Sequence, residues 1–227
     1  MRRVGIMNRK TLGSLSANNN PIQSISLPKP KLNRNKSLFN SLLKRHTNRS
    51  ISEKKLSIQI ISNLLWAANG VNRKIGPFGG QGRTSASASN SQEIEIFVAM
   101  EQGTYIYEPS KHELIPVLNG DIRGLAISYG QRENGFNAPV RLIYVVDLEK
   151  YMKAGFQEPG LYDPEIQKSY YYVDTGIIAE NVYLFASSVG LAAWFHNCNR
   201  TALAKILKLS QTKKVLFSQT IGYPVNR

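Results

Sequence analysis

In several stretches of the chain, apolar residues are separated by one, three or four positions. This spacing places them on one face of a helix. This spacing predicts helices over residues 38–43, 57–70, 169–190 and 201–209. Ser57 is placed to cap the start of the second helix, Gly70 to end it, and Thr201 to cap the fourth. The first helix is expected to end in a basic cluster at residues 44–49.

Other stretches alternate in polarity or stay apolar throughout, which predicts strands. The run "EIEIFVAM" alternates, and "TYIYEPSKHELIPV" is typical of two strands around a turn. The run "RLIYVVDL" is continuously apolar, as in a central strand buried on both faces, and "VLFSQTIGYP" predicts one more strand. These elements predict an α+β fold with a mixed sheet of four to five strands surrounded by helices.

The segment between the second helix and the first strand, residues 71–92, contains many glycine and hydroxyl residues. It is longer than a passive connection usually is, which indicates a functional loop. Its "GPFGGQG" run lacks the strand-to-helix context of a P-loop or a dinucleotide-binding motif. We therefore predict a flexible lid rather than a phosphate cradle.

The first 37 residues are rich in Asn, Ser, Pro and Lys and show no sustained periodicity. They predict a basic, largely disordered arm whose "PKPK" stretch is extended and lies over a surface. A chain of 227 residues is long enough for one sizeable core, so residues 38–227 are expected to form a single domain.

The formal net charge of +14 suggests a nucleic-acid partner at first sight. Residues 1–55 contain 13 Lys and Arg against one acidic residue, which leaves 16 against 14 for residues 56–227. The globular part is thus nearly neutral, and a nucleic-acid partner is not expected for it.

The apolar window at residues 177–195 approaches the length of a membrane span, but Glu180, Asn181 and Ser187 within it are costly in lipid. A buried helix is therefore predicted, and no membrane partner. No run resembles a secretory signal, and the single cysteine, Cys198, cannot form an internal disulfide. We expect a cytoplasmic protein.

The histidines, His46, His112 and His196, show no spacing typical of a closed zinc site, so no metal is predicted. Cys198 lies two positions after His196 and could act as a thiol nucleophile, but a lone buried cysteine is more often a small core residue. His112 falls in the predicted hairpin turn, where a surface position is expected.

The stretch "KRHTNRSI" places Arg45 and Arg49 on either side of Thr47. Guanidinium groups together with a hydroxyl suit a phosphate monoester. A charged helix end that interacts with its own C-terminal carbonyl groups would explain the same residues. The stretch alone leaves both interpretations open.

Taken in order, "KRHTNRSI", "LLWAANGVN", "RTSASASNSQEIEIFVA", the helix ending in "SSVGLAAWF", and "TIGYP" resemble the flavin-dependent nitroreductase superfamily. Within it, the chain is most similar to SagB-type or thiazole/oxazole-oxidase-like dehydrogenases, over about residues 25–227. The resemblance implies a three-layer fold and an intertwined homodimer, with two FMN sites at the interface and the helix over residues 174–190 between the subunits.

The resemblance also implies roles for the basic cluster. Arg45, His46 and Thr47 match residues that hold the FMN phosphate, and Arg49 matches one that reaches the pyrimidine side of the ring. Reduced flavin carries negative charge near N1 and O2, which a cation at Arg49 would stabilise. A basic phosphate ligand after "GYP" could be Arg227.

A second set of matches concerns the flavin ring. Ala86, Ser87 and Ala88, with Asn90 shortly after, match a family segment that lies against the ring. The family usually has proline in place of Ala86 and Glu93, so a softer loop is expected. The "AAWFHN" stretch, with Trp194, occupies the place where relatives set backbone N–H groups near flavin N5 and O4. Core packing or a dimer contact would also explain Trp194.

The implied activity is an FMN-dependent oxidoreductase that transfers hydride between NAD(P)H and a small or unsaturated substrate in two steps. No catalytic residue is assigned. An alternative is an azoline (thiazoline or oxazoline) dehydrogenase acting on a modified peptide, for which Tyr170, Tyr171 and Tyr172 are candidates by position. A second alternative is a flavin-less binding protein with a basic arm.

Overall fold

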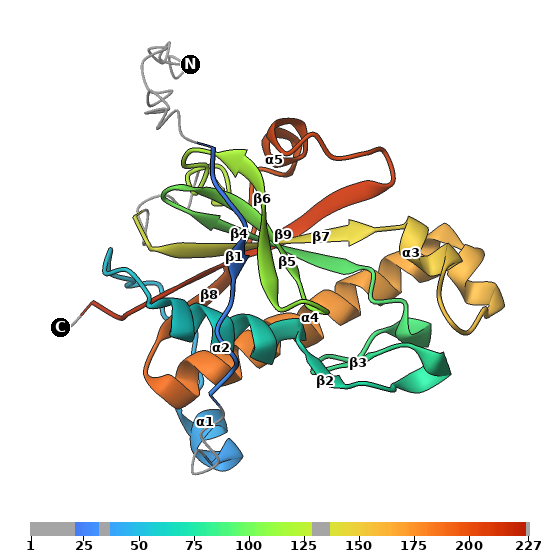
Figure 1. Cartoon of the computed structure of the whole chain (residues 1–227), viewed down its shortest axis with the longest axis horizontal. Coiled ribbons are helices and arrows are strands. Elements are labelled where there is room, and N and C mark those ends of the chain that lie inside the picture. The colour runs from blue at the N-terminus through green and yellow to red at the C-terminus, as the bar shows by residue number, and fades with distance from the viewer. Residues whose placement is uncertain (1–20, 32–36, 129–136, 226–227) are drawn as a thin grey trace, which may run out of the picture.

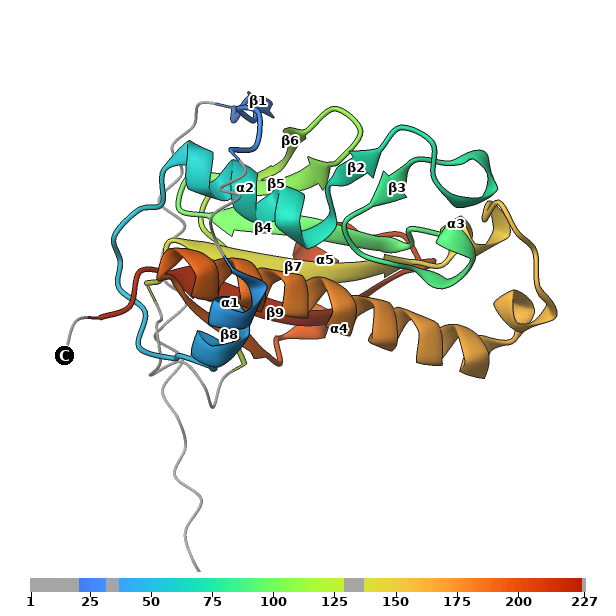
Figure 2. The same cartoon turned by 90° about the horizontal axis from the view of Figure 1, so that it is seen from below.

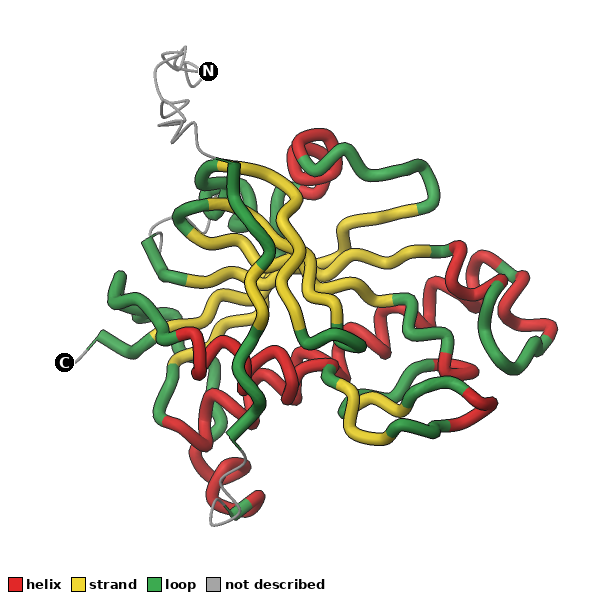
Figure 3. Tube along the Cα trace, in the orientation of Figure 1, coloured by secondary structure: helices red, strands yellow, loops and turns green. Residues whose placement is uncertain are grey.

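The structure of this chain is a computed structural model that describes residues 21–31, 37–128 and 137–225. Its centre is a seven-stranded sheet in the order β1-β6-β5-β4-β7-β9-β8, in which every neighbouring pair is antiparallel (Figures 1 and 3). The strands are β1 (Ile25–Ser26), β4 (Ile94–Met100), β5 (Gly103–Glu108), β6 (Glu113–Asn119), β7 (Val140–Asp147), β8 (Ala192–His196) and β9 (Lys213–Gly222).

Helices cover both faces of this sheet. They are α1 (Leu38–Lys44), α2 (Ile58–Asn69), α3 (Glu149–Met152), α4 (Pro164–Val189) and α5 (Arg200–Ile206). The helices α2 and α4 lie on one face and α5 on the other, which gives three layers (Figure 1). A small ribbon, β2 (Val71–Arg73) with β3 (Gly82–Arg83), projects beside them.

The alternation of side chains along the central strands explains the layers. On β4 and β7, alternate residues enter the core beneath α2 and α4: Ile94, Ile96, Val98, Leu142, Tyr144 and Val146. The residues between them enter a second core with Leu203 of α5: Phe97, Ala99, Ile143 and Val145. Every residue of β7 is buried, which confirms the prediction of a central strand covered on both faces.

The α+β architecture is confirmed, but the sheet differs from the prediction of four to five strands in mixed pairing. Two strands that the sequence did not predict, β8 and β1, account for the larger number of strands. The short strand β8 begins two residues after Gly190, which ends α4 with φ +75°, and its few residues carry little periodic signal. The strand β1 lies in the stretch that the sequence assigns to the arm.

The predicted arm therefore ends earlier than residue 37. Leu27 is buried, and its N–H donates to the His112 carbonyl at 3.1 Å. The Ser62 hydroxyl donates to the Pro28 carbonyl at 2.5 Å, so the "PKPK" stretch lies along α2. Residues 1–20 and 32–36 lie outside the described residues.

Helix ends were predicted unequally well. Ser57 caps α2 by accepting the N–H of Ile60, and Gly70 ends it, as predicted. The cap of α5 is Asn199, not Thr201, because the Asn199 side chain accepts the N–H of Ala202 at 3.1 Å. The helix α4 has 26 residues, starting with Pro164 after the capping Asp163, and is longer than predicted. No helix in the described ranges is both long and apolar enough to cross a membrane.

Candidate cofactor site

The basic stretch after α1 is extended and is held by backbone hydrogen bonds on both sides. The N–H of Asn48 donates to the Ala193 carbonyl of β8 at 3.0 Å, and the N–H of Ser52 donates to the Tyr223 carbonyl at 2.8 Å. The N–H of Val225 donates in turn to the Ser50 carbonyl at 3.0 Å. The stretch thus runs beside the start of β8 and the C-terminal segment, near the C-terminal end of α4 (Figures 1 and 2).

Side chains of α4 hold the first half of this stretch. The hydroxyl groups of Thr47 and Tyr183 are 3.1 Å apart, and the Arg45 guanidinium lies 5.6 Å from the centre of the Tyr183 ring. Arg45 also lies 3.9 Å from a carboxylate oxygen of Glu180, with both side chains partly exposed. An ion pair this long and exposed contributes little, so the guanidinium can still bind another anion.

The second half rests on β8. The Arg49 guanidinium lies 5.5 Å from the centre of the Trp194 ring, a cation–π arrangement. Trp194 is 2% exposed and packs at 4.4 Å against the His196 ring. The Trp194 side chain therefore packs in the interior and supports Arg49.

His196 and its partners lie beneath Trp194. The ring hydrogen-bonds to the Thr220 hydroxyl at 2.7 Å and to the Asn197 carbonyl at 2.8 Å. Burial lowers the pKa of His196 to about 4, so the ring is neutral at physiological pH. The basic character of this region thus comes from the arginines, not from His196.

An open pocket of about 710 Å³ lies over the basic stretch. It is lined by His46, Thr47, Asn48, Arg49, Ser50, Pro224 and Val225. Exposed Arg49 and His46, a hydroxyl and main-chain groups line one concave surface, which is a donor set that fits a phosphate dianion. Arg227 lies outside the described residues.

The second predicted segment is a tightly folded loop on another part of α4. The N–H of Ala88 donates to an Asp174 carboxylate oxygen at 3.0 Å, and the Ser87 hydroxyl accepts the N–H of Gln92 at 3.1 Å. The Asn90 side chain donates to the Pro77 carbonyl at 3.2 Å. Ser89, Asn90 and Gln92 have φ near +50°, and Ala86 is exposed. Small side chains thus leave the backbone at Ala86–Ala88 accessible to a flat group.

Within the described part of one chain, the two segments line separate pockets. Thr47 is held at Tyr183 and Ala88 at Asp174, and nine residues of helix span about 14 Å. At 3.6 residues per turn, nine residues also place the two side chains about half a turn apart. The segments therefore attach to different sides of α4 as well as to different heights along it (Figure 2).

Comparison with known proteins identifies the family. The sequence model of the Nitroreductase family matches residues 42–223. The chain belongs to the Nitroreductase family. A nitroreductase-family protein of Methanocaldococcus jannaschii is 29% identical over 161 residues, which is 66% of this chain and 73% of the relative.

Solved structures share the nitroreductase fold. One from Ralstonia eutropha has a TM-score of 0.77 at 28% identity and covers 99% of this chain and 97% of its own. The E. coli microcin synthetase McbBCD complex contains a chain with a TM-score of 0.64 at 22% identity, covering 98% and 85%. An NADPH:FMN oxidoreductase from Vibrio harveyi, solved with NAD⁺, has a TM-score of 0.58 at 16% identity, covering 83% and 69%.

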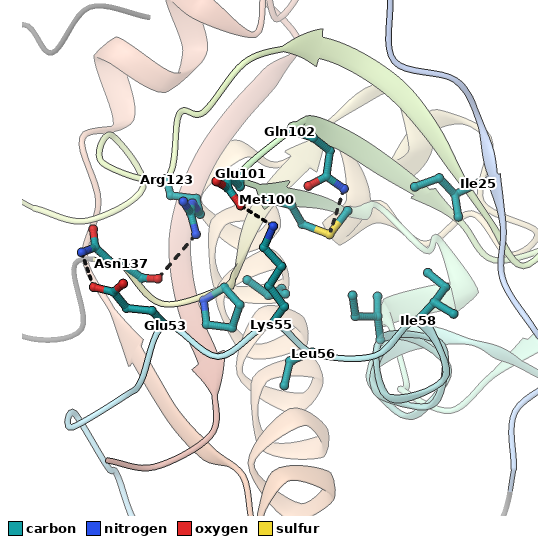
Figure 4. A pocket seen from close by; sticks show the side chains of 13 residues that line it. Ile25, Glu53, Lys55, Leu56, Ile58, Met100, Glu101, Gln102, Arg123 and Asn137 are labelled. Carbon is teal, nitrogen blue, oxygen red and sulfur yellow. Dashed lines mark hydrogen bonds and ion pairs between the residues drawn. The ribbon is translucent and has the colours of Figure 1, made fainter. Parts of the chain in front are cut away.

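A further cavity of this Nitroreductase-family protein, about 570 Å³, lies where α2 begins, beside the β4–β5 turn (Figure 4). Lys55 lies 2.7 Å from Glu101 and Arg123 lies 2.7 Å from Asp121, whereas Glu53 accepts a hydrogen bond from the Asn137 side chain. None of the predicted site residues lines it. The cavity is therefore separate from the basic pocket.

Several chemical alternatives are resolved by burial. Cys198 is buried in the core beneath α5, and burial raises the pKa of its thiol, so it is a core residue rather than a nucleophile. The prediction that His112 is a plain surface residue is wrong. Its ring bonds to the Ser62 hydroxyl at 2.8 Å and to the Tyr107 hydroxyl at 2.9 Å, which links α2 to the hairpin.

The three consecutive tyrosines have separate environments. Tyr170 donates to Glu158 at 2.6 Å, Tyr171 is buried, and Tyr172 is 41% exposed beside Phe217. The loop over residues 71–92 contains the β2–β3 ribbon and two short 3₁₀ turns, so it is more structured than a flexible lid suggests.

Sequence reasoning missed three residues that organise the site: Tyr183, Asp174 and Glu93. All three are buried, Glu93 completely. A signal existed for Asp174, because a carboxylate in a helix expected to be buried needs a partner. Glu93 is the neighbour of Asp174, because both line one small cavity and the Glu93 carboxylate raises the pKa of Asp174.

Proposed function

We propose that this protein is an FMN-dependent oxidoreductase that transfers hydride between NAD(P)H and a small or unsaturated substrate. The observation that carries the proposal is the open basic pocket, in which Thr47 is fixed by Tyr183 and Arg49 by Trp194. Membership of the Nitroreductase family supports the reaction class. When bound, FMN would supply the hydride-accepting and hydride-donating chemistry.

The chain's own residues would bind and orient that cofactor. Arg45, His46 and Thr47 would hold the phosphate. His46 and Thr47 line the basic pocket, and Arg45 precedes them on the same stretch, with its guanidinium over the Tyr183 ring. Arg49 would lie nearer the pyrimidine side, where a fixed cation stabilises negative charge. The Ala86–Asn90 loop would contact the ring.

We further propose a homodimer in which one chain's basic stretch and the other's Ala86–Asn90 loop form each site. Within one chain these segments lie on different sides of α4, so a second copy is needed to complete a site. An exposed apolar surface is available for it, because α1 exposes Phe39 at 77% and Leu43 at 84%. Val173 of α4 is a separate exposed apolar residue, at 60%.

The first experiment tests the cofactor. Protein purified from cells is expected to be yellow, with flavin absorption bands, and Arg45→Glu is expected to abolish FMN retention while the dimer stays intact. Lys111→Glu is the matched control, because Lys111 is exposed in the β5–β6 turn, far along the sequence from the pocket. Unchanged FMN affinity in Arg45→Glu refutes the phosphate assignment. A colourless protein that FMN cannot reconstitute supports a binding protein with a basic arm.

Within the family we propose the SagB-type, or thiazole/oxazole-oxidase-like, subgroup, on the strength of the ordered sequence motifs. The McbBCD chain is compatible with this assignment through its fold. Azoline dehydrogenation of a modified peptide is the second candidate. Two assays separate the candidates: NAD(P)H consumption with a nitroarene or quinone acceptor, and oxidation of a thiazoline-containing peptide with oxygen. Turnover in the second assay alone replaces the reductase proposal.

A further inference from the structure

Two carboxyl groups meet in the interior directly behind the Ala86–Asn90 loop. Glu93 precedes β4 and is 0% exposed, and Asp174 lies in α4 and is 5% exposed. The two side chains are neighbours, and the Glu93 carboxylate raises the pKa of Asp174. Both also line a small cavity of about 10 Å³ together with Ala86 and Ser87. The loop and the carboxyl pair therefore form one packed unit.

The hydrogen bonds around the pair occupy one oxygen of each carboxyl group, so a proton can lie between the two groups. The Ser91 hydroxyl donates to Glu93 Oε2 at 2.7 Å, and the N–H of Ala88 donates to Asp174 Oδ2 at 3.0 Å. No donor in the described part of the chain has good hydrogen-bond geometry to Glu93 Oε1. Two adjacent carboxyl groups cannot both ionise cheaply in the interior, so a proton kept on Asp174 can be donated to Glu93.

The titratable neighbours of the pair in the described part of the chain supply no compensating positive charge. Burial, and next the Glu93 carboxylate, raise the pKa of Asp174 to about 8, whereas the bond from the Ala88 N–H acts in the opposite direction. From α3, the Tyr151 hydroxyl lies beside Glu93, and from α4 itself Tyr170 and Tyr171 are the neighbouring titratable groups. None of these groups is a cation, so the charge of a second carboxylate would stay unbalanced.

We propose that Glu93 and Asp174 are positioning residues that share one proton, and that this proton holds the Ala86–Asn90 loop in the shape that binds the flavin ring. This inference rests on the proposed function. Loss of the proton places two negative charges side by side. Their repulsion separates Asp174 from Glu93, and Asp174 carries the N–H of Ala88 with it. Flavin affinity should therefore fall as the pair deprotonates.

Asp174→Asn is the decisive variant. The amide is nearly isosteric, its oxygen can accept the N–H of Ala88, and its NH₂ can donate to Glu93 without any titrating proton. Glu165→Gln is the matched control, because it removes one negative charge from an exposed position of the same helix. The measurements are the FMN dissociation constant and the melting temperature of the full chain, each from pH 7 to pH 9.

In the wild type, FMN affinity is expected to fall about tenfold from pH 7 to pH 9, because the protonated fraction of a group with a pKa near 8 falls by that factor. The melting temperature should fall over the same range. Asp174→Asn should show neither change, and Glu165→Gln should behave as the wild type. An infrared band of a protonated carboxyl group, present at pH 7 in the wild type and absent in Asp174→Asn, identifies the proton directly.

Two results would overturn the inference. Identical pH profiles of melting in wild type and Asp174→Asn exclude a shared proton. FMN binding with the same pH dependence in both proteins excludes its influence on the loop. A third result is distinct: if the melting profiles differ as expected but neither protein binds FMN, the shared proton stands and the proposed function fails.

Discussion

The hydroxyl of Tyr183 connects three parts of the candidate site, and its removal is the most informative single change. It accepts the N–H of Phe195 in β8 at 2.8 Å and lies 3.1 Å from the Thr47 hydroxyl. The ring itself lies 5.6 Å beneath the Arg45 guanidinium, and the residue is 9% exposed. Tyr183→Phe removes both hydrogen bonds and keeps the ring beneath Arg45.

The expected cost follows from the groups left without partners. An N–H left unpaired in the interior costs about 1–3 kcal/mol, whereas the half-buried Thr47 hydroxyl can turn to water at little cost. The free energy of unfolding should therefore fall by about 2 kcal/mol. For a protein of this size that corresponds to a melting temperature lower by about 4–8 °C. Freeing Thr47 should weaken FMN binding by about 1 kcal/mol, or roughly fivefold.

Calorimetry and fluorescence titration with FMN measure the two effects. Tyr223→Phe is the control, because Tyr223 lies beside the same stretch under Lys54, and its hydroxyl makes no hydrogen bond among the described residues. A double-mutant cycle with Thr47→Val should show coupling of at least about 0.5 kcal/mol. A melting temperature within about 1 °C of the wild type, or full additivity with Thr47→Val, refutes the reasoning.

Two further predictions concern acid stability and assembly. The folded chain binds a proton at His196 only near pH 4, whereas the unfolded chain binds it near pH 6.5, so stability should fall as the pH is lowered from 6.5 to 4, by up to about 3 kcal/mol. His196→Gln should flatten that decline when the free energy of unfolding is measured in urea at several pH values. The same decline in wild type and variant would contradict the assignment to His196. Phe39→Glu, on exposed α1, should convert a dimer to a folded monomer in sedimentation, and an unchanged dimer places the interface elsewhere.

The parts of the fold that the sequence predicts well are those with a strong local signal. Ser57 and Gly70 bracket a helix with one apolar face, and the continuous run at Val140–Asp147 can hardly be anything but a central strand. Such signals depend on neighbours within a few positions. The caps and periods of α2 and β7 are complete within their own segments, so no tertiary information was needed.

The wrong predictions concern features that depend on residues far apart in the sequence. His112 occupies a turn with φ +51°, a position that is usually exposed, but Ser62 is 50 residues away in sequence and binds its ring. The two-residue strand β1 exists only because β6 offers an unpaired edge. Contacts between distant residues decide both cases, and no local pattern contains them.

The candidate site depends on both kinds of information. Its motifs can be recognised from neighbouring residues, but the way they come together depends on residues far apart in the sequence. Thr47 and Ala88 attach to residues of α4 nine positions apart, on different sides of the helix. If each site takes its basic stretch from one chain and its loop from the other, two defective chains can complement each other. A mixed dimer of Arg45→Glu with Ala86→Trp, whose new side chain would block the ring from an exposed position, then contains one intact site.

Neither variant alone should bind FMN, but refolding them together should restore binding. Random pairing makes half of the dimers mixed, with one of two sites intact, so about a quarter of the wild-type FMN content is expected. A site built within one chain gives a different result, because each chain then carries its own defect and mixing restores nothing. Flavin content after co-refolding therefore decides whether the two sides of α4 belong to one site or to two.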